Sequence, residues 1–307
     1  MKSKFLRPKD KVAVIAPSGR IFEKDLEDNL QWLQSLDLEP VFGKNLFNDH
    51  YNGYHYAGNV EERTADLQWA LDDDEIQAIW CARGGYGAVH LLDKINWEKF
   101  QRNPKWLIGY SDTTALHGHI NAMGIGSIHG ITVKKLNCDY TVESFESLEK
   151  ALFGVPMKYE IAAHPLNRLG KIQGRLVGGN LSLLYSLVGS KSFDFQGETV
   201  LFVEDWNENW YHIDRMLTNF KRSGQLAKIK ALLVGSFTRM DVAQENPDFH
   251  KSFDQTTQQI IHQMMQAYDI PMAFQFPAGH IGDNRALLLG TTVNLEITKN
   301  KVTLEFR

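Results

Sequence analysis

The sequence predicts an α/β protein of two domains, in which a parallel sheet with helices on both faces is followed by a mixed α/β domain. A length of 307 residues is typical of two domains, each with its own core. In the first half, short apolar runs that end in polar or glycine-rich loops alternate with segments of helical apolar spacing. This alternation favours a flavodoxin- or Rossmann-like parallel sheet. The second half ends in two short strands separated by Lys299-Asn300, a turn typical of a hairpin.

The first domain is expected to span residues 1–155 and to alternate strands with helices. Strands are predicted at Val12–Ala16, Glu39–Phe42, Ile76–Ala82, Trp106–Gly109 and Ile125–His129. Helices are predicted at Lys24–Leu36, Val60–Leu71, Ala88–Leu92, Asp112–Met123 and Val142–Phe153.

Residues 156–170 contain two prolines and little periodicity, and we expect them to form the linker. The second domain is expected to span residues 171–307. Its predicted strands are Lys171–Val177, Thr199–Glu204, Ala231–Ser236, Met272–Phe276, Arg285–Leu289, Thr292–Thr298 and Lys301–Phe306. Its predicted helices are Asn180–Val188, Tyr211–Lys221 and Phe253–Ala267.

Composition limits the partners of the chain. The formal net charge of −4, from 33 basic and 37 acidic residues, leaves no basic surplus, so no nucleic-acid partner is expected. No segment approaches the roughly 20 apolar residues of a membrane-spanning helix, so no membrane contact is expected. Of the two cysteines, Cys81 lies in an apolar run and is expected to be a small buried hydrophobe, and Cys138 is the other. This cysteine usage favours a reducing compartment, so a cytoplasmic protein is expected.

Ser111 lies where the apolar run Trp106–Gly109 gives way to helix-forming sequence. Several hydrolase folds hold a nucleophile at such a sharp strand-to-helix turn, because the turn exposes the hydroxyl and the helix start offers N–H groups to an oxyanion. The alternative is a helix N-cap, because serine is among the best cap residues. The local sequence favours the cap, so the decision rests on partners elsewhere in the chain.

A nucleophilic serine needs a base, and the base needs a partner that fixes its tautomer. Of eleven histidines, His280 stands in a glycine-flanked loop after the predicted strand Met272–Phe276, where catalytic residues often gather. Glu204 ends another apolar strand and is the candidate acid, and spacing does not separate it from Asp205 and Glu208. The alternatives are a surface turn histidine and a solvated acidic cluster.

Other histidines are poorer candidates for the base. His117 and His119 are two positions apart on a predicted helix and therefore face different ways. His50, His55 and His90 lie among polar residues and are expected at the surface.

A glycine-rich loop, Cys81–Gly87, follows the third predicted strand. Its glycines allow positive φ angles and let backbone N–H groups approach a ligand, either as an oxyanion donor or as a phosphate cradle. Neither nucleotide-binding glycine motif is present, which weakens the phosphate alternative. Two roles are equally compatible with Arg83: it binds a substrate carboxylate, or it forms a structural ion pair. Pro17-Ser18-Gly19, after the first strand, is expected at the same crevice.

Over nearly the whole chain, these motifs resemble those of the serine LD-carboxypeptidases, also called muramoyltetrapeptide carboxypeptidases. In the first half the shared motifs are Ile15-Ala16-Pro17-Ser18-Gly19, Tyr56-Ala57-Gly58 with Glu62-Arg63, Ala82-Arg83-Gly84-Gly85-Tyr86-Gly87-Ala88, and Gly109-Tyr110-Ser111-Asp112-Thr113-Thr114-Ala115-Leu116. In the second half they are Gly178-Gly179-Asn180-Leu181, Val203-Glu204-Asp205 with Glu208, Arg215-Met216-Leu217, and Gly279-His280 with Asn284. Each motif alone is weak, but together and in the family's order they are specific.

The resemblance implies a Ser-His-Glu triad of Ser111, His280 and Glu204, with the acid and the base on the second domain. It also implies an oxyanion hole made of the backbone N–H groups of Asp112 and Gly85. Neither a metal nor a cofactor is expected.

The resemblance further implies a murein peptide substrate, from which the enzyme releases terminal D-alanine in cytoplasmic peptidoglycan recycling, and a homodimer. Candidate substrate contacts are Arg83, Tyr86 and Trp206. One departure from the family pattern is His129-Gly130-Ile131, where many members have His-Gly-Pro. It lies outside the triad and concerns only the local shape of the loop.

Two alternative functions remain. A branch of this family resembles microcin self-immunity hydrolases, which cleave a peptidyl-aminoacyl nucleotide with the same triad. Trp206 and Trp210 would suit an aromatic ligand in that branch, although such tryptophans more often pack internally or at a dimer interface. The other alternative is a non-catalytic module that binds a small ligand in the crevice between two domains.

Overall fold

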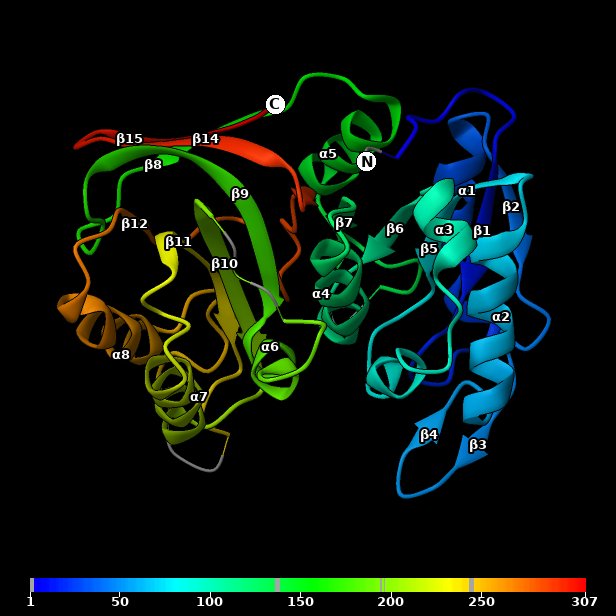
Figure 1. The fold of residues 1–307 in the computed structure, drawn as a ribbon, viewed down its shortest axis with the longest axis horizontal. Helices are drawn as coiled ribbons and strands as arrows, with labels where there is room; N and C mark the ends of the chain where they lie inside the picture. The colour runs from blue at the N-terminus through cyan, green and yellow to red at the C-terminus, as the bar shows by residue number, and fades with distance from the viewer. Residues whose placement is uncertain (1–2, 136–138, 194, 196, 243–245) are drawn as a thin grey trace.

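Two sheets lie side by side in the computed structural model and divide the molecule into two halves (Figure 1). The structure describes residues 3–135, 139–193, 195, 197–242 and 246–307. Within these residues, one half holds a six-stranded sheet and the other a seven-stranded sheet. Strands and helices alternate through both halves, which confirms the predicted α/β class.

The first sheet is parallel except at one edge. In spatial order its strands are β13 (Leu287–Leu289), β7 (Ser127–His129), β6 (Trp106–Gly109), β5 (Ile76–Cys81), β1 (Lys11–Ile15) and β2 (Glu39–Phe42). Strand β13 pairs antiparallel with β7, and the other neighbours are parallel. All four residues of β6 are buried, as expected of a strand covered on both faces.

Helices cover both faces of the first sheet and create an apolar core on each side. The helices are α1 (Glu27–Ser35), α2 (Val60–Asp72), α3 (Glu98–Arg102), α4 (Thr114–Ala122) and α5 (Val142–Phe153). Short 3₁₀ turns are η1 (Glu23–Asp25), η2 (Ala88–Leu91) and η3 (Ser111–Thr113), and a hairpin joins β3 (His50–Tyr51) to β4 (His55–Tyr56). Helices α1 and α5 contribute Leu33 and Leu148 to one core. Helices α2 and α4 contribute Leu67 and Leu116 to the other.

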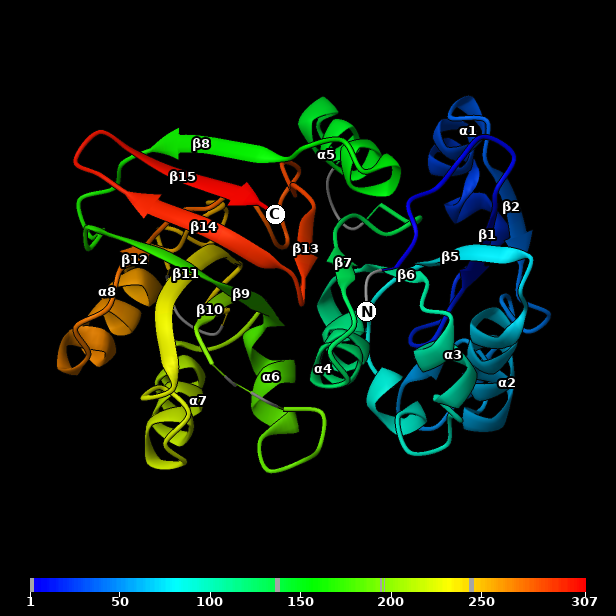
Figure 2. The same ribbon diagram turned by 45° about the horizontal axis from the view of Figure 1, so that its top comes forward.

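The second sheet is half parallel and half antiparallel. In spatial order its strands are β12 (Met272–Ala273), β11 (Ile229–Thr238), β10 (Thr199–Trp206), β9 (Gly170–Asn180), β14 (Thr292–Ile297), β15 (Lys301–Phe306) and β8 (Lys158–Ala162). Its helices are α6 (Leu181–Leu187), α7 (Trp210–Arg222) and α8 (Gln255–Met264), followed by the turn η4 (Met265–Ala267). These helices all lie on one side of the sheet (Figures 1 and 2).

Three segments differ from the expectation. Residues expected in the linker form β8, which pairs antiparallel with β15 and alternates exposed with half-buried positions. The tail strand expected in the second domain, β13, instead joins the first sheet, because Leu288 pairs with Ile128 of β7. Strand β12 ends at Ala273, before Gln275, whose backbone has a positive φ of 60°.

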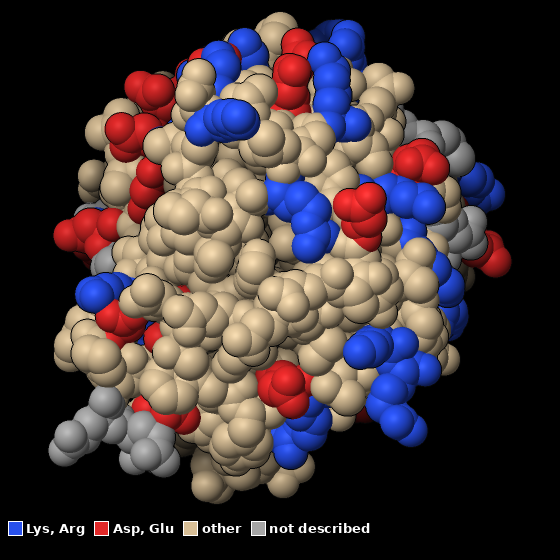
Figure 3. All heavy atoms as spheres, turned by 90° about the vertical axis from the view of Figure 1, so that its left-hand side faces the viewer, with Lys and Arg blue, Asp and Glu red and all other residues tan. Residues whose placement is uncertain are grey.

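The surface of the second half carries charges of both signs. Figure 3 shows a broad uncharged area on this face, with Lys and Arg next to Asp and Glu around it. In the part of the chain that the structure describes, the helices are all too short or too polar to cross a lipid bilayer.

Candidate active site

Ser111 directly follows the end of β6, where the backbone turns sharply into α4. Its φ of 62° lies in the left-handed region, which costs a residue with a side chain about 1–3 kcal/mol and is found mainly where function requires it. The residue before η3 is Tyr110, and no side chain caps either η3 or α4. The N-cap interpretation of Ser111 is therefore wrong, and the turn presents the side chain as a nucleophile elbow does.

The glycine-rich loop after β5 packs directly against Ser111. A Cβ atom on Gly84 would lie 2.8 Å from the Ser111 Cβ atom and 3.0 Å from Oγ, so only glycine fits there. The next residue, Gly85, has a φ of 120°, and its N–H group has no hydrogen-bond acceptor in the described part of the chain. Asp112 lies in the first helical turn, where N–H groups lack partners within the helix. The two predicted oxyanion donors therefore belong to segments that meet at Ser111.

His280 and Glu204 form a buried hydrogen-bonded pair on the second half of the molecule. The His280 Nδ1 atom lies 2.6 Å from Glu204 Oε2, and the two side chains are 8% and 0% exposed. Because a carboxylate only accepts hydrogen bonds, Nδ1 carries the proton and Nε2 is left as the acceptor. The structure thus brings together the predicted base and the predicted acid, although they are 76 residues apart in the sequence.

Gly279 lets the histidine loop lie directly on the acid. Its φ is 119°, and a Cβ atom there would lie 2.7 Å from Glu204 Oε2. The loop is fixed on its other side, because the Gly279 N–H donates to Asn284 Oδ1 at 2.8 Å and the Asn284 N–H donates to Ser144 of α5 at 2.8 Å. A side chain at position 279 would push His280 away from its carboxylate.

The two rival acids have other partners. Asp205 is buried and accepts hydrogen bonds from the Asn180 side chain at 2.7 Å and from the Ser182 N–H at 2.9 Å. Burial raises the pKa of Asp205 well above its usual value. Glu208 pairs instead with His212 at 2.6 Å. Of the three candidate acids, Glu204 is the one that contacts His280.

Aromatic rings hold His280 next to the serine turn. Its ring lies edge-on to Tyr110, with centroids 4.9 Å apart, and nearly parallel to Trp206, with centroids 5.9 Å apart. Tyr110 directly precedes Ser111, so His280 of the second half packs against the residue next to the predicted nucleophile. The Ser111 hydroxyl makes no hydrogen bond with His280 or with any other described residue. Catalytic hydrogen bonds often form only when the substrate is present.

The other histidines considered as the base either hydrogen-bond inside the protein or lie at the surface. His117 is buried and bonds to the Gly109 carbonyl and to Ser127 Oγ, both at 2.9 Å, and burial lowers its pKa to about 4. His119 bonds to Ser192 Oγ at 2.8 Å. The predicted surface histidines His50, His55 and His90 are exposed, as expected.

The departure at His129-Gly130-Ile131 lies at the end of β7. His129 is buried between the rings of Tyr110 and Phe202, and burial lowers its pKa well below the usual value. The histidine is therefore neutral and serves as packing between the two halves. Gly130 bonds through its N–H to the Gly109 carbonyl at 3.1 Å, which ties this loop to the end of β6.

The three predicted substrate contacts differ in exposure. Arg83 is half-buried beside Gly84, whereas Tyr86 is 46% exposed and lies edge-on to His90. Trp206 is half-buried beside His280. Trp210 packs at the core of the second half and donates to Asp254 at 3.0 Å, so its role is structural.

Cysteine and metal chemistry is not supported by the described residues. Cys81 is fully buried, as predicted, and burial raises the pKa of its thiol to about 12. Cys138 lies outside the described residues. In the ranges that the structure covers, no group of three or more His, Cys, Asp or Glu side chains has the arrangement of a metal site.

Comparison with known proteins shows to which family the chain belongs. The LD-carboxypeptidase N-terminal domain matches residues 12–130, and the LD-carboxypeptidase C-terminal domain matches residues 173–295. A probable murein peptide carboxypeptidase of Bacillus subtilis is 34% identical over 314 aligned residues, which cover 99% of this chain and 94% of that protein. The chain belongs to the LD-carboxypeptidase family.

Other LD-carboxypeptidase relatives agree. The murein tetrapeptide carboxypeptidase of Pseudomonas aeruginosa is 30% identical, with 93% of each chain covered. The crystal structure of muramoyltetrapeptide carboxypeptidase from Oxalobacter formigenes has the same fold, with a TM-score of 0.84, 24% identity and coverage of 96% of this chain and 98% of that one. The microcin C7 self-immunity protein also shares the fold, with a TM-score of 0.85, 20% identity and coverage of 99% and 98%.

One part of this LD-carboxypeptidase site escaped the sequence analysis. The buried Asp112 carboxylate accepts hydrogen bonds from Ser18 Oγ at 2.6 Å and from the Ala88 N–H at 2.8 Å. Buried Arg63 donates through Nη1 to the carbonyls of Pro17 and Gly87, at 2.7 and 2.9 Å. Together these two side chains fix the glycine-rich loop to the loop after β1. We refer to Ser18, Arg63 and Asp112 as the loop clamp.

A signal for part of the loop clamp was present in the sequence. Arg63 stands three positions after Val60 and four before Leu67, so a charge occupies the apolar stripe of α2. A charge in that place needs several buried hydrogen bonds. No comparable signal marks the Asp112 side chain, because its partners are distant in sequence.

Proposed function

We propose that this protein is a serine LD-carboxypeptidase that releases the terminal D-alanine of murein tetrapeptides, cleaving its bond to the L-centre of meso-diaminopimelate. The observation that carries the proposal is the buried His280–Glu204 pair, which lies against Tyr110, next to the strained serine turn. The family membership and the names of the relatives support the substrate class.

The proposed reaction follows the serine triad. The Ser111 oxygen attacks the scissile carbonyl carbon while His280 Nε2 takes the hydroxyl proton and Glu204 stabilises the resulting imidazolium. The oxyanion accepts hydrogen bonds from the N–H groups of Asp112 and Gly85, each worth about 10²–10³ in rate. The C–N bond then breaks, and D-alanine leaves with the proton from His280. Water attacks the acyl-enzyme with His280 again as the base, which frees the tripeptide and Ser111.

The finer parts of the proposal concern location and assembly. We propose a cytoplasmic homodimer that acts in peptidoglycan recycling, as the family resemblance implies. Light scattering of the purified protein during gel filtration tests the assembly. We expect a mass of about twice that of the 35.0 kDa chain, and a mass of one chain would contradict the dimer.

A second candidate function is the hydrolysis of a peptidyl-aminoacyl nucleotide. One observation favours it: a half-buried aromatic ring, Trp206, lies beside His280, and aromatic rings stack on nucleobases. The microcin C7 self-immunity protein, of the same fold, has been solved in complex with aspartyl sulfamoyl adenosine.

One experiment tests the proposal and separates the two candidates. The purified protein is incubated with murein tetrapeptide or with a peptidyl-aminoacyl nucleotide, and released D-alanine or nucleotide is measured. We expect release of D-alanine with a kcat/KM far above that for the nucleotide. The opposite preference would favour the second candidate, and no release of either with no fluorophosphonate labelling of Ser111 would favour a binding module.

A further inference from the structure

We infer that Arg83 and Tyr54 form a carboxylate-binding subsite beside the oxyanion hole, which holds a carboxylate of the peptide substrate. The inference rests on the proposed function, since it assigns the two residues to substrate binding in the same site. The murein tetrapeptide carries a carboxylate on its terminal D-alanine and another on the side chain of diaminopimelate. Both sources share one chemistry, and the experiment below distinguishes them.

The position of Arg83 is the first observation. Its side chain packs against Gly19, where a Cβ atom would lie 3.2 Å from the guanidinium carbon. The Gly19 N–H donates to the Gly84 carbonyl at 3.3 Å, and Gly84 is the residue that packs on Ser111. Only these short backbone segments separate the guanidinium from the nucleophile.

Tyr54 brings a second donor to the same place. Its hydroxyl lies 2.7 Å from the position of a Cβ atom on Gly19, and a Cβ atom on Gly85 would overlap it. Burial raises the pKa of Tyr54, so the hydroxyl stays protonated and is able to donate a hydrogen bond. A guanidinium with a phenol beside it matches the planar, acceptor-only carboxylate group.

Among the described residues, the charge of Arg83 has no ion-pair partner. Its Nε and Nη1 atoms donate to the carbonyls of Gly84 and Arg20, at 3.2 and 2.7 Å, which hold the side chain in place. No carboxylate of the described residues forms an ion pair with it, and its second terminal nitrogen, Nη2, makes no hydrogen bond with any of them. An oriented, half-buried arginine without a counterion is suited to bind an anionic ligand.

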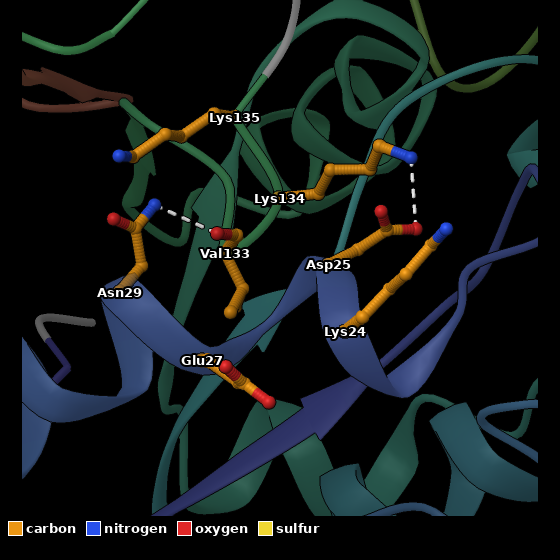
Figure 4. Close-up of a pocket in the computed structure, with 7 residues that line it drawn as sticks. All are labelled: Lys24, Asp25, Glu27, Asn29, Val133, Lys134 and Lys135. Carbon is orange, nitrogen blue, oxygen red and sulfur yellow. Dashed lines mark hydrogen bonds and ion pairs between the residues drawn. The ribbon is translucent and has the colours of Figure 1, made fainter.

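Three other cations already have partners. Arg20 pairs with Asp49 at 2.5 Å. In the pocket of about 210 Å³ beside α1, Lys134 pairs with Asp25 at 2.8 Å (Figure 4). Arg63 is buried and donates to three backbone carbonyls. Arg239, in the half of the molecule that carries His280, is exposed and lies over the Trp206 ring, so it is the rival that the test has to exclude.

The test measures selectivity for a carboxylate within each variant, so that a general loss of activity cancels. For wild type, Arg83→Gln, Arg83→Lys and Tyr54→Phe, kcat/KM is measured on the tetrapeptide and on two analogues. One analogue ends in D-alaninamide, and the other carries an amide on the diaminopimelate side chain. Arg20→Gln is the matched control, because it removes a neighbouring charge and keeps the backbone carbonyl that Arg83 bonds.

We expect wild type to prefer the acid over one of the two amides by about 10- to 100-fold, the range of a hydrogen bond to a charged group. The amide that is discriminated identifies the carboxylate. The ratio of kcat/KM on the acid to that on the amide should fall close to one in Arg83→Gln. It should be intermediate in Arg83→Lys and Tyr54→Phe, and unchanged in Arg20→Gln.

Two results would overturn the inference and leave the proposed function intact. One is a wild-type enzyme that releases D-alanine without preferring the acid over either amide. The other is an Arg83→Gln variant that keeps the full preference, particularly if Arg239→Gln loses it. A wild-type protein that releases no D-alanine would instead contradict the proposed function itself.

Discussion

The orientation of His280 depends on a single buried carboxylate. Glu204 is fully buried, and its Oε2 atom accepts the Nδ1 proton of His280 at 2.6 Å, while its Oε1 atom has no partner among the described side chains. A buried carboxylate with so few hydrogen bonds interacts strongly with a positive charge nearby. In the proposed reaction, the pair therefore fixes the tautomer of His280 and stabilises the imidazolium that forms.

The first prediction concerns this pair. Glu204→Gln keeps the shape of the side chain but brings an amide that can donate to Nδ1, which favours the wrong tautomer. We expect kcat for D-alanine release to fall by about 10⁴-fold, as for the equivalent amide substitution in serine proteases. Glu208→Gln is the matched control, since Glu208 pairs with His212 instead. Equal activity in the two variants would mean that Glu204 does not orient the base.

At the scale of elements, the loop clamp holds three segments in one arrangement. Asp112 on η3 connects the loop after β1, through Ser18, to the start of η2, through Ala88. Arg63 on α2 bonds to carbonyls of the same two segments. The glycine-rich loop that supplies one predicted oxyanion donor is thus fixed by side chains from its neighbours.

The second prediction is a pH dependence of stability that comes from the clamp. Burial raises the pKa of Asp112 from 3.8 to about 6. Between about pH 4 and pH 6, the folded protein therefore keeps a proton that the unfolded chain releases. The free energy of unfolding should fall as the pH rises through this range, by about 3 kcal/mol relative to an Asp112→Asn variant.

Urea unfolding at a series of pH values measures this difference. Asp214→Asn, the same change at an exposed position of α7, is the control and should follow the wild-type curve. Parallel curves for wild type and Asp112→Asn would show that Asp112 is not held in its neutral form.

At the scale of the whole molecule, the proposed mechanism needs the two halves to meet at one place. Helix α4, which follows the serine, contacts β9 of the second sheet, and Thr114 Oγ1 accepts a hydrogen bond from the Asn180 N–H at 3.0 Å. Strand β9 lies next to β10, which carries Glu204. The position of Ser111 relative to His280 and Glu204 therefore depends on the close approach of α4 to β9.

The third prediction tests this approach. A Cβ atom on Gly179 would lie 2.5 Å from Thr114 Oγ1, so Gly179→Ala should force α4 and β9 apart. Because a displacement of about 1 Å can cost 10²-fold in rate, we expect kcat to fall by about 10- to 100-fold. The circular dichroism spectrum of the variant should remain that of the folded wild type.

Gly189→Ala is the matched control for that variant. Gly189 also has a positive φ, of 87°, but nothing lies within 4 Å of an added Cβ atom. The Gly189→Ala variant therefore has the same kind of backbone strain as Gly179→Ala but no clash with a neighbouring side chain. Its kcat should stay close to that of wild type. Equal losses in both variants would indicate that strain, and not the separation of the halves, lowers the activity.

Most of the fold could be predicted from local patterns, and the exceptions are contacts between distant segments. The apolar run of β6 and the spacing of α5 depend on nearby residues, and both were found with the correct bounds. The edge strand β13 pairs with a strand more than 150 residues earlier, which no local pattern reports. The strand β8 was missed because three of its five positions are exposed and its sequence lacks an apolar run.

The candidate site shows the same division. Ser111, Glu204 and His280 could be predicted because each follows or ends a strand and the motifs resemble those of a known family. Spacing did not separate Glu204 from Asp205 and Glu208; the family resemblance implied Glu204, and the hydrogen bonds of the three acids agree with that choice. The role of the Asp112 carboxylate and the position of Tyr54 could not be predicted, because both depend on loops that meet only in the folded chain.

The rate of D-alanine release by purified Ser111→Ala, compared with wild type, tests the central claim most directly. The variant removes one oxygen atom from a half-buried side chain. Because this hydroxyl makes no hydrogen bond with the described residues, the variant should fold. We predict a loss of about 10⁴-fold or more, since nucleophile and base act as a unit. Release of D-alanine by Ser111→Ala at the wild-type rate would contradict the account.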